Sequence, residues 1–286
     1  MHPAQKLRQT LDEEPFVIAP GAMDCISARA VEQNGFAVIY MTGMGTSACR
    51  LGLPDYGLAT MTEMVANAAA MTKAVRIPII ADADTGYGNE LNMTRTVIEY
   101  EHIGVAGIHI EDQVSPKKCG HLDRKQVIPR NEFVSKIAAA VAARQNPGFL
   151  LIARTDAAGV LGFDEAIDRA NAALDVGADM ALVEAPETVD EVLRVPQLVR
   201  GPCVLNILFG GKSPLLPFEL IVQAGYRLAF LSDVLLGSAF AAYDNVLCQV
   251  KEARQSAAVP SLPHIAPARE IFRRLGSEEW DSLRAS

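Results

Sequence analysis

The sequence predicts one large (β/α)8 barrel, a TIM barrel, with an extra helical segment at its C-terminal end. The chain has 286 residues, 50% of them hydrophobic, and single α/β barrels commonly have this length. Eight short hydrophobic runs alternate with longer stretches that have helical spacing, and polar residues stand directly after several of these runs. Eight strand–helix units in a chain of this length favour a closed barrel.

The predicted strands are continuous apolar runs, as strands buried on both faces require. In order they are 16–20, 37–41, 78–82, 106–110, 149–153, 180–184, 203–207 and 227–231. The predicted helices are 24–35, 60–75, 90–104, 131–145, 163–177, 188–199, 214–225 and 235–255. Asp24 and Thr60 are suitable N-cap residues for the first two helices, and several helices end in a glycine just before the next strand.

The main alternative is an open, doubly wound sheet. No GxGxxG follows the first predicted strand, and acidic residues end many strands instead of one or two, which favours the barrel. We assign residues 1–255 to the catalytic barrel and 256–286 to a linker with C-terminal helices. Residues 256–269 are rich in proline and serine, and an amphipathic stretch follows them. That stretch is expected to pack on the barrel bottom or on a neighbouring subunit.

Composition favours a cytoplasmic enzyme that acts on small molecules. The net charge is -8 and there is no basic block, so nucleic acid and anionic membranes are poor partners. The five cysteines are scattered without a CxxC pair, which argues against a disulfide framework and for a reducing compartment. We expect no signal peptide and no transmembrane span, because no apolar run is long enough.

Three carboxylates are predicted to gather at the C-terminal ends of the strands, where such barrels place their catalytic groups. Asp82 and Asp84 are two residues apart, so both side chains should lie on one side of an extended chain, and Glu111 ends the next strand. A divalent cation would relieve their repulsion, and ligands that are all oxygen favour Mg²⁺ or Mn²⁺. The alternative is that each acid is a helix N-cap or an ion-pair partner.

Other strand ends carry residues suited to an acidic substrate. Arg154 could hold a carboxylate or phosphonate with two hydrogen bonds, or could pair with Glu184 or Glu111. Asn206 could donate to an oxyanion or cap a turn. After strand 37–41, the backbone N–H groups of Thr42, Gly43 and Met44 could form an anion nest. Alternatively, Gly43 and Gly45 could serve only to make a turn.

The stretch SPKKCGHLDRK, residues 115–125, follows Glu111 closely and should hang over the same strand ends. A surface cysteine among lysines should have a lowered pKa, so Cys119 is predicted to be reactive. Gly120 would let the loop fold over the site, and His121 could tune the thiol or bind substrate. The alternative is a chance exposed thiol in a solvated run of charges.

These motifs resemble the isocitrate lyase/phosphoenolpyruvate mutase superfamily. The resemblance rests on YMTGMGTS, LGLPD, ADADTGYGN, GIHIEDQ, PKKCGH, ARTDA and VEAP. The cysteine-containing loop is similar to that of its carbon–carbon lyases, the group of methylisocitrate lyase, 2,3-dimethylmalate lyase and petal-death protein. The resemblance implies Mg²⁺ in contact with Asp82, with Asp55, Asp84 and Glu111 acting largely through water. It also implies a homotetramer in which neighbouring subunits exchange their last helices.

The resemblance further implies cleavage of a substituted 2-hydroxydicarboxylate to an α-keto acid and a carboxylate. Cys119 would be the general acid and Tyr40 is a candidate base. The implied catalytic residues are Cys119, Tyr40, Lys117, His121 and Arg154. The implied substrate-binding residues are Thr42, Gly43, Met44, Gly120, Arg154, Glu184 and Asn206.

The sequence departs from methylisocitrate lyases at two places. Phe209 stands at or near an expected glutamate, and Leu231–Ser232 replace Tyr-Pro with no substrate arginine after them. A tricarboxylate substrate loses a partner there, which favours an alkylmalate. Because of Ser232, hydrolysis of oxaloacetate is an alternative reaction. A second alternative is a phosphonomutase of the carboxyphosphonoenolpyruvate type. A third is a non-catalytic barrel in which the acids only cap helices.

Overall fold

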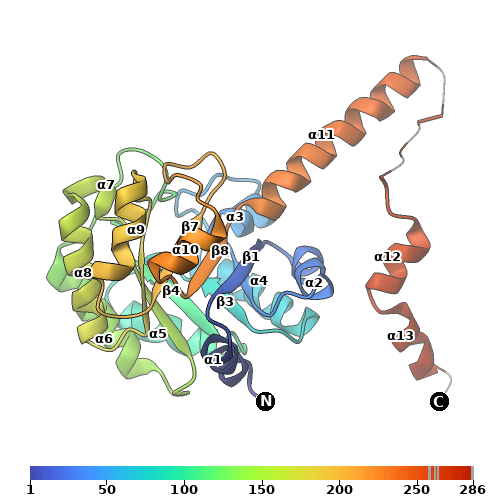
Figure 1. The fold of residues 1–286 in the computed structure, drawn as a ribbon. Helices are drawn as coiled ribbons and strands as arrows, with labels where there is room; N and C mark the ends of the chain where they lie inside the picture. The colour runs from blue at the N-terminus through green and yellow to red at the C-terminus, as the bar shows by residue number, and fades with distance from the viewer. Residues whose placement is uncertain (257–258, 261, 263, 285–286) are drawn as a thin grey trace. The chain divides into compact units, whose positions relative to one another are not determined.

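The computed structural model describes residues 1–256, 259–260, 262 and 264–284. Its eight parallel strands form a closed barrel in sequence order, with β1 paired to both β2 and β8 (Figure 1). This confirms the predicted barrel and excludes the open sheet. The strands are β1 (Val17–Ala22), β2 (Ile39–Met41), β3 (Ile79–Asp82), β4 (Gly107–Glu111), β5 (Leu150–Thr155), β6 (Met180–Val183), β7 (Cys203–Ile207) and β8 (Leu228–Leu231).

The strand register brings predicted site residues together. Glu111 at the end of β4 lies beside Arg154 of β5, and Asp82 at the end of β3 lies beside His109 of β4. Asn206 of β7 is the partner of Phe230 in β8. Since all strands are parallel, these residues lie at the same end of the barrel.

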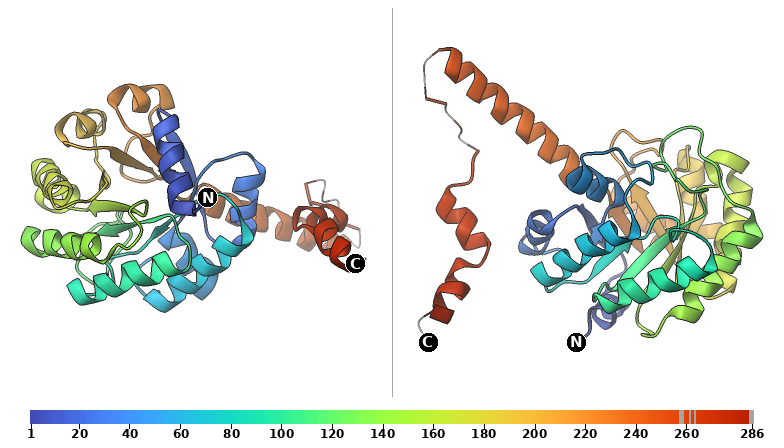
Figure 2. Two further views of the ribbon diagram at one scale, coloured as in Figure 1. Left: turned by 90° about the horizontal axis from the view of Figure 1, so that it is seen from below. Right: turned by 180° about the vertical axis from the view of Figure 1, so that it is seen from behind.

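The helices of the barrel are α1 (Pro3–Glu13), α2 (Cys25–Gln33), α3 (Gly43–Leu51), α4 (Met61–Ala74), α5 (Glu90–His102), α6 (Arg130–Ala143), α7 (Ala158–Leu161), α8 (Phe163–Asp175), α9 (Val189–Leu198) and α10 (Phe218–Ala224). They surround the strands (Figure 2). The predicted caps are confirmed: Asp24 caps α2, and Thr60 and Glu63 form a capping box on α4.

Helix α1 was not predicted, and it lies at the end of the barrel where the strands begin (Figure 1). Leu7 and Leu11 pack into the same buried cluster as strand residues such as Ile80. Arg8 donates to the carbonyl of Gly148 at 3.0 Å and forms a 2.7 Å ion pair with Asp179. These contacts join α1 to the start of two strands and close the end opposite to the site.

The chain divides into two compact units, residues Met1–Gly237 and Ser238–Ser286, so the division lies inside α11 (Val234–Gln255). The second unit also holds α12 (Ala268–Arg274) and α13 (Ser277–Arg284). Residues 257–258, 261 and 263 of the predicted linker lie outside the described residues. Among the described helices, none has the length and apolar character needed to cross a membrane.

Candidate active site

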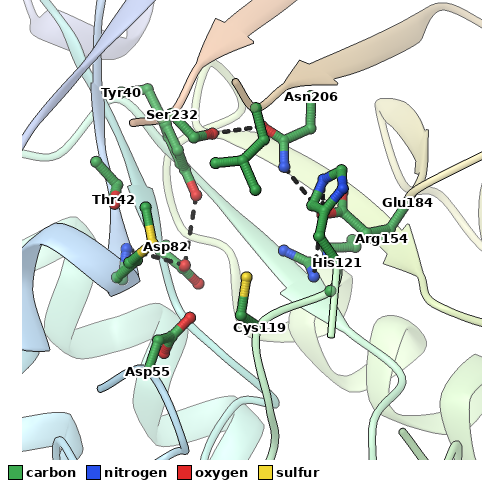
Figure 3. A pocket seen from close by; sticks show the side chains of 14 residues that line it. Tyr40, Thr42, Asp55, Asp82, Cys119, His121, Arg154, Glu184, Asn206 and Ser232 are labelled. Carbon is green, nitrogen blue, oxygen red and sulfur yellow. Dashed lines mark hydrogen bonds and ion pairs between the residues drawn. The ribbon is translucent and has the colours of Figure 1, made fainter. Parts of the chain in front are cut away.

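A small pocket of about 30 Å³ lies at the C-terminal ends of the strands (Figure 3). Its lining comes from six strand ends, from α3 and the loop 52–60 after it, and from the segment 112–129 that joins β4 to α6. The lining residues are Tyr40, Thr42, Gly43, Met44, Asp55, Asp82, Cys119, Gly120, His121, Arg154, Glu184, Asn206, Leu208 and Ser232. The pocket therefore gathers all predicted site residues except Lys117, Asp84 and Glu111.

Asp82 is the acid held most firmly within this pocket. Its Oδ2 accepts the N–H of Gly43 at 3.0 Å and the hydroxyl of Tyr40 at 3.3 Å, and its Oδ1 accepts the N–H of Asp84 at 2.9 Å. Burial alone would raise its pKa, but His109, Lys117 and Arg154 lower the pKa of Asp82 to about 2. The carboxylate is therefore ionised at neutral pH.

Tyr40, the candidate base, is buried in a chain of hydrogen bonds. Its hydroxyl lies 2.8 Å from His109 Nε2, and its ring stacks on Phe230 with centroids 4.1 Å apart. His109 Nδ1 is buried without a partner, so we assign the ring proton to Nε2, which donates to Tyr40. Burial, followed by the charge of Asp82, raises the pKa of Tyr40 well above its ordinary value. The phenol therefore stays protonated at neutral pH, and its O–H donates a hydrogen bond to Asp82.

The stretch after β2 is a helix instead of the predicted turn. Thr42 is the N-cap of α3, and its side chain accepts the N–H of Gly45 at 2.9 Å. The N–H of Gly43 donates to Asp82, so that donor of the predicted anion nest is already occupied by a carboxylate of the protein. A side chain at Gly43 would overlap Asp82, which explains why glycine is required here.

Lys117 lies among all four predicted metal-binding acids. Its Nζ is 2.6 Å from Asp55 Oδ1 and 2.8 Å from Asp84 Oδ1. Burial alone would lower its pKa, but Asp84, Asp55, Glu111 and Asp82 raise the pKa of Lys117 well above its ordinary value. The lysine is therefore a permanent positive charge beneath the pocket.

Asp84 and Glu111 are buried beside Lys117 without lining the pocket. Asp84 has a φ of 47°, so the chain has left the strand there, and the extended geometry predicted for Asp82–Asp84 is wrong. Burial, with the charges of Asp82 and Asp55, raises the pKa of Asp84 to about 6. Burial raises the pKa of Glu111 well above its ordinary value, and both of its carboxyl oxygens lack hydrogen-bond partners.

These acids fit a hard cation, with one restriction. Carboxylate oxygens are the ligands that Mg²⁺ prefers, and both carboxyl oxygens of Glu111 are buried without hydrogen-bond partners, which a cation or its water could satisfy. In the described part of the chain, however, no group of three or more His, Cys, Asp or Glu side chains is arranged to hold a metal ion directly. The predicted direct convergence of three carboxylates is therefore not formed.

Arg154 lies between three buried carboxylates on the other side of the pocket. Its Nε donates to Asp156 at 2.9 Å, and it forms longer ion pairs with Glu111 at 3.4 Å and Glu184 at 3.5 Å. The pairing that sequence reasoning gave as the alternative role of Arg154 is thus present, and its principal partner, Asp156, was missed. Asp156 directly follows Thr155, the last residue of β5, which is the signal that could have identified it.

A chain of hydrogen bonds fixes the wall formed by β6, β7 and β8. Asn206 donates to Glu184 at 2.9 Å and accepts the hydroxyl of Ser232. His121 Nε2 lies 3.3 Å from Glu184, and His121 Nδ1 accepts the N–H of Lys212 at 2.9 Å. Although burial would raise it, the pKa of Glu184 is held well below its ordinary value by Arg154 and His121.

Cys119 points into the pocket between the Asp82–Asp55 side and the Arg154–His121 side (Figure 3). Its N–H donates to the carbonyl of Asp55 at 3.0 Å, which fixes the loop over the site. Burial raises the pKa of the Cys119 thiol, and Asp55 and Glu184 add to this effect. The prediction of a lowered pKa was wrong, because the loop is closed and Lys117 is paired with acids.

The base of segment 112–129 is held by a buried arginine of α8. Arg169 Nη1 donates to Asp112 Oδ2 at 3.0 Å and to the carbonyl of Ile128 at 2.7 Å, so it joins both ends of the segment. Its Nε donates to Glu165 at 2.8 Å. Asp112 also accepts the hydroxyl of Thr155 at 2.6 Å and the N–H of Asp156 at 2.8 Å.

Replacing Arg169 by Met should destabilise the barrel strongly, since it leaves the buried Asp112 without its cation. Removing one partner of a buried ion pair costs ~3–5 kcal/mol of the free energy of unfolding. Thermal melts should show a clear fall in Tm. The matched control is Arg194→Met, because Arg194 is 47% exposed and pairs with Asp190 on the surface. Equal shifts in Tm for the two variants would contradict this role of Arg169.

Gly120→Ala should reduce activity without unfolding the protein. A methyl group at Gly120 would overlap Arg154 Nη2 and lie 2.5 Å from Glu184 Cγ. Both side chains would have to move, whereas the backbone could stay in place. We expect a lower kcat/KM with little change in Tm, measured by steady-state kinetics and thermal melts. Gly159→Ala is the control, since a methyl group there would have ordinary contacts with Lys125.

Comparison with known proteins decides the family. Residues 7–251 match the family described as phosphoenolpyruvate phosphomutase. The chain belongs to this family. The family assignment confirms the resemblance to the isocitrate lyase/PEP mutase superfamily that the motifs predicted.

Relatives in the family are named lyases. The 2,3-dimethylmalate lyase of Eubacterium barkeri is 47% identical over 228 residues, which is 80% of this chain and 79% of that protein. The 2-methylisocitrate lyase of Aeropyrum pernix is 38% identical over 250 residues, 87% of this chain and 80% of that protein. These names confirm the predicted enzyme class, a carbon–carbon lyase of the superfamily.

Solved structures of the family share the whole fold. Oxaloacetate acetylhydrolase in complex with 3,3-difluorooxalacetate has a TM-score of 0.92 and 37% identity, covering 99% of this chain and 97% of that one. Phosphonopyruvate hydrolase in complex with oxalate and Mg²⁺ has a TM-score of 0.88 and 30% identity, covering 100% and 99%. A metal-bound member of the superfamily therefore has the same barrel.

Proposed function

We propose that this protein is a Mg²⁺-dependent lyase that cleaves an alkyl-substituted 2-hydroxydicarboxylate, such as an alkylmalate, to an α-keto acid and a carboxylate. Cys119 acts as the general acid. One observation carries the proposal: a buried thiol with a raised pKa points into the pocket, opposite Asp82 and beside Arg154. A thiol that keeps its proton at neutral pH is what a general acid needs.

The metal would be held at the Asp82 side of the pocket. Asp82 is ionised and lines the pocket, so it would contact Mg²⁺, while Asp55, Asp84 and Glu111 would act largely through water. The bound ion would supply Lewis acidity toward the oxygens of the substrate. Mn²⁺ suits the same oxygen ligands.

The reaction then needs one proton removed and one delivered. A base takes the proton of the 2-hydroxyl, and the electrons of that O–H bond form the carbonyl of the departing α-keto acid. The C2–C3 bond breaks, and its electrons pass to the carboxylate-bearing fragment. Arg154 donates to the oxygens of that fragment, and the Cys119 thiol protonates its carbon. The thiolate regains its proton before the next turnover.

The far side of the pocket suits a small substituent. Leu208 and Ser232 line the pocket there. The arginine expected after the eighth strand in methylisocitrate lyases has no counterpart in this sequence. Among the described lining residues, Arg154 is the only arginine or lysine, and three carboxylates already surround it. A third substrate carboxylate would therefore lack a cation. Phe209, which stands near the expected glutamate, is 54% exposed and does not line the pocket.

Hydrolysis of oxaloacetate is the second candidate function. Ser232 supports it, because its hydroxyl lines the pocket and donates to Asn206, so a polar group stands beside the substrate. The likeness to oxaloacetate acetylhydrolase adds to this. In this reaction water first adds to the 2-keto group of oxaloacetate. The hydroxyl formed in this way then loses its proton, as the 2-hydroxyl of an alkylmalate would.

One panel assay tests both candidates. Purified protein with Mg²⁺ is given malate, methylmalates, 2,3-dimethylmalate, methylisocitrate and oxaloacetate, and the keto acid is measured with lactate dehydrogenase. Acetate and oxalate are measured separately for oxaloacetate. The proposal expects the highest kcat/KM for an alkylmalate. Turnover of phosphonates alone, followed by phosphorus NMR, would instead identify a phosphonomutase.

We also propose a cytoplasmic homotetramer that exchanges its C-terminal helices. Large apolar side chains on these helices are exposed, among them Leu247 of α11, Phe272 of α12 and Trp280 of α13. Such side chains are typical of helices that pack against a partner. The five free cysteines agree with a reducing compartment. Light scattering after size exclusion should give four times the mass of 30.7 kDa.

A further inference from the structure

Lys125, near the end of segment 112–129, is a buried lysine that neither the sequence nor the proposed reaction explains. Its Nζ donates to the carbonyl of Gly120 and forms a 2.9 Å hydrogen bond with Asp156 Oδ1. The side chain of Lys125 is 3% exposed and that of Asp156 is fully buried. A lysine buried to this extent needs a specific charged partner.

Asp156 connects Lys125 to the arginine of the pocket. Arg154 donates to Asp156 Oδ2 through Nε at 2.9 Å and to Oδ1 through Nη2 at 3.2 Å. Lys125 and Arg154 therefore share Oδ1. Burial alone would raise the pKa of Asp156, but Arg154 and Lys125 together lower it, so the carboxylate stays ionised between the two cations.

The other contact of Lys125 fixes the part of the loop that meets Arg154. Gly120 lies against both Arg154 and Glu184, so closely that a methyl group at Gly120 would overlap the guanidinium. The carbonyl of Gly120 receives the ammonium of Lys125, and Gly120 follows Cys119 directly. One side chain thus joins the tip of the loop to the carboxylate that orients Arg154.

The charge balance around Arg154 gives this contact a second consequence. Asp156, Glu111 and Glu184 surround the single guanidinium of Arg154. Without Lys125, Asp156 would be neutralised by Arg154 alone and would hold it more firmly. Lys125 therefore leaves part of the hydrogen-bonding capacity of Arg154 for a bound carboxylate.

We propose that Lys125 is a positioning residue that couples closure of segment 112–129 to the alignment of Arg154. It holds the Gly120 carbonyl, and with it Cys119, over the pocket while it balances the charge of Asp156. The kinetic part of this proposal rests on the lyase function proposed above, whereas the closure itself does not.

The test compares Lys125→Met and Lys125→Arg with Lys118→Met, which removes the same charge from the same loop without touching Asp156. Hydrogen exchange by mass spectrometry follows peptides from segment 112–129 in the free proteins. Steady-state kinetics with the best acid of the panel gives kcat and KM. Thermal melts check that each variant is folded.

Lys125→Met should increase exchange in the segment at least about tenfold and lower kcat more than it raises KM, since Cys119 loses its alignment and Asp156 holds Arg154 away from the substrate. Lys125→Arg should show exchange and kcat between those of Lys125→Met and the wild type. Lys118→Met should match the wild type in both measurements. Exchange and kcat equal to those of Lys118→Met would overturn the proposal. If the wild type cleaves none of the acids, the lyase function fails, and the exchange data alone decide the role of Lys125.

Discussion

Cys119→Ser is expected to lower kcat by about 10²–10⁴-fold, the usual contribution of a general acid. Serine keeps the size of the side chain and the backbone bond from the Cys119 N–H to Asp55. Its hydroxyl is a far weaker acid than a thiol, so the carbanion-like fragment is protonated slowly. Steady-state kinetics with the best acid of the panel gives the result.

Three comparisons make this result specific. Cys49→Ser, at an exposed thiol, should leave kcat unchanged. Mg²⁺ binding and Tm of Cys119→Ser should equal those of the wild type, because neither depends on the thiol. Normal turnover by Cys119→Ser would remove the thiol from the reaction and favour a phosphonomutase, which needs no such acid.

The raised pKa of Cys119 can be measured directly by alkylation with iodoacetamide across pH. Only the thiolate reacts, so the rate should rise through the pKa of the thiol. Because burial raises that pKa, the midpoint should lie above ~8.5, the ordinary value for cysteine. A midpoint below that value would mean that the loop is open in solution and that the lysines lower the pKa, as the sequence had suggested.

Asp82→Asn is expected to abolish Mg²⁺ binding and to lower kcat by at least about 10³-fold, since a metal ion contributes several kcal/mol to such reactions. Asn is nearly the same shape, and its carbonyl oxygen can still accept from Gly43 and Tyr40. The change therefore removes the charge and keeps these two hydrogen bonds, while the amide nitrogen replaces the oxygen that accepts the N–H of Asp84. Calorimetric titration with Mg²⁺ and the kinetic assay measure the two effects.

The stability of Asp82→Asn should fall together with its activity. Despite burial, the pKa of Asp82 is lowered to about 2, so His109, Lys117 and Arg154 stabilise the ionised carboxylate in the folded protein, and a neutral amide loses that stabilisation at neutral pH. Asp175→Asn, at a surface residue, is the control and should keep full activity. An unchanged Tm would contradict this stabilisation of the ionised Asp82, and undiminished Mg²⁺ binding would place the metal elsewhere.

The strands could be predicted because each is buried on both faces and so is a continuous apolar run. Helix α1 was missed because its apolar face is narrow; Leu7 and Leu11 are its only large buried residues. Helix α3 was missed because Gly43 and Gly45 suggested a turn, whereas packing against Asp82 and Met23 requires small residues inside a helix. In both cases, tertiary contacts outweigh local preference.

Placement at a strand end was enough to predict most of the pocket. Asp82, Arg154 and Asn206 face it because the strand register sets their depth in the barrel. The path of segment 112–129 was not predictable in the same way. Lys117 reaches Asp55 and Lys125 reaches Asp156 because of how the loop folds back, and no local spacing encodes those pairs.

The pocket of about 30 Å³ has a consequence for how substrates are admitted. About 10–15 Å³ of such space holds one water molecule, so the pocket has room for two or three. A dicarboxylate is larger than that, so the loop over the pocket has to move to admit it. The measured affinity is then the intrinsic affinity reduced by the fraction of molecules in which the loop has moved. A substitution that releases the loop therefore has opposing effects on KM, because the substrate enters more readily but is held less firmly, whereas its effect on the chemical step is in one direction only.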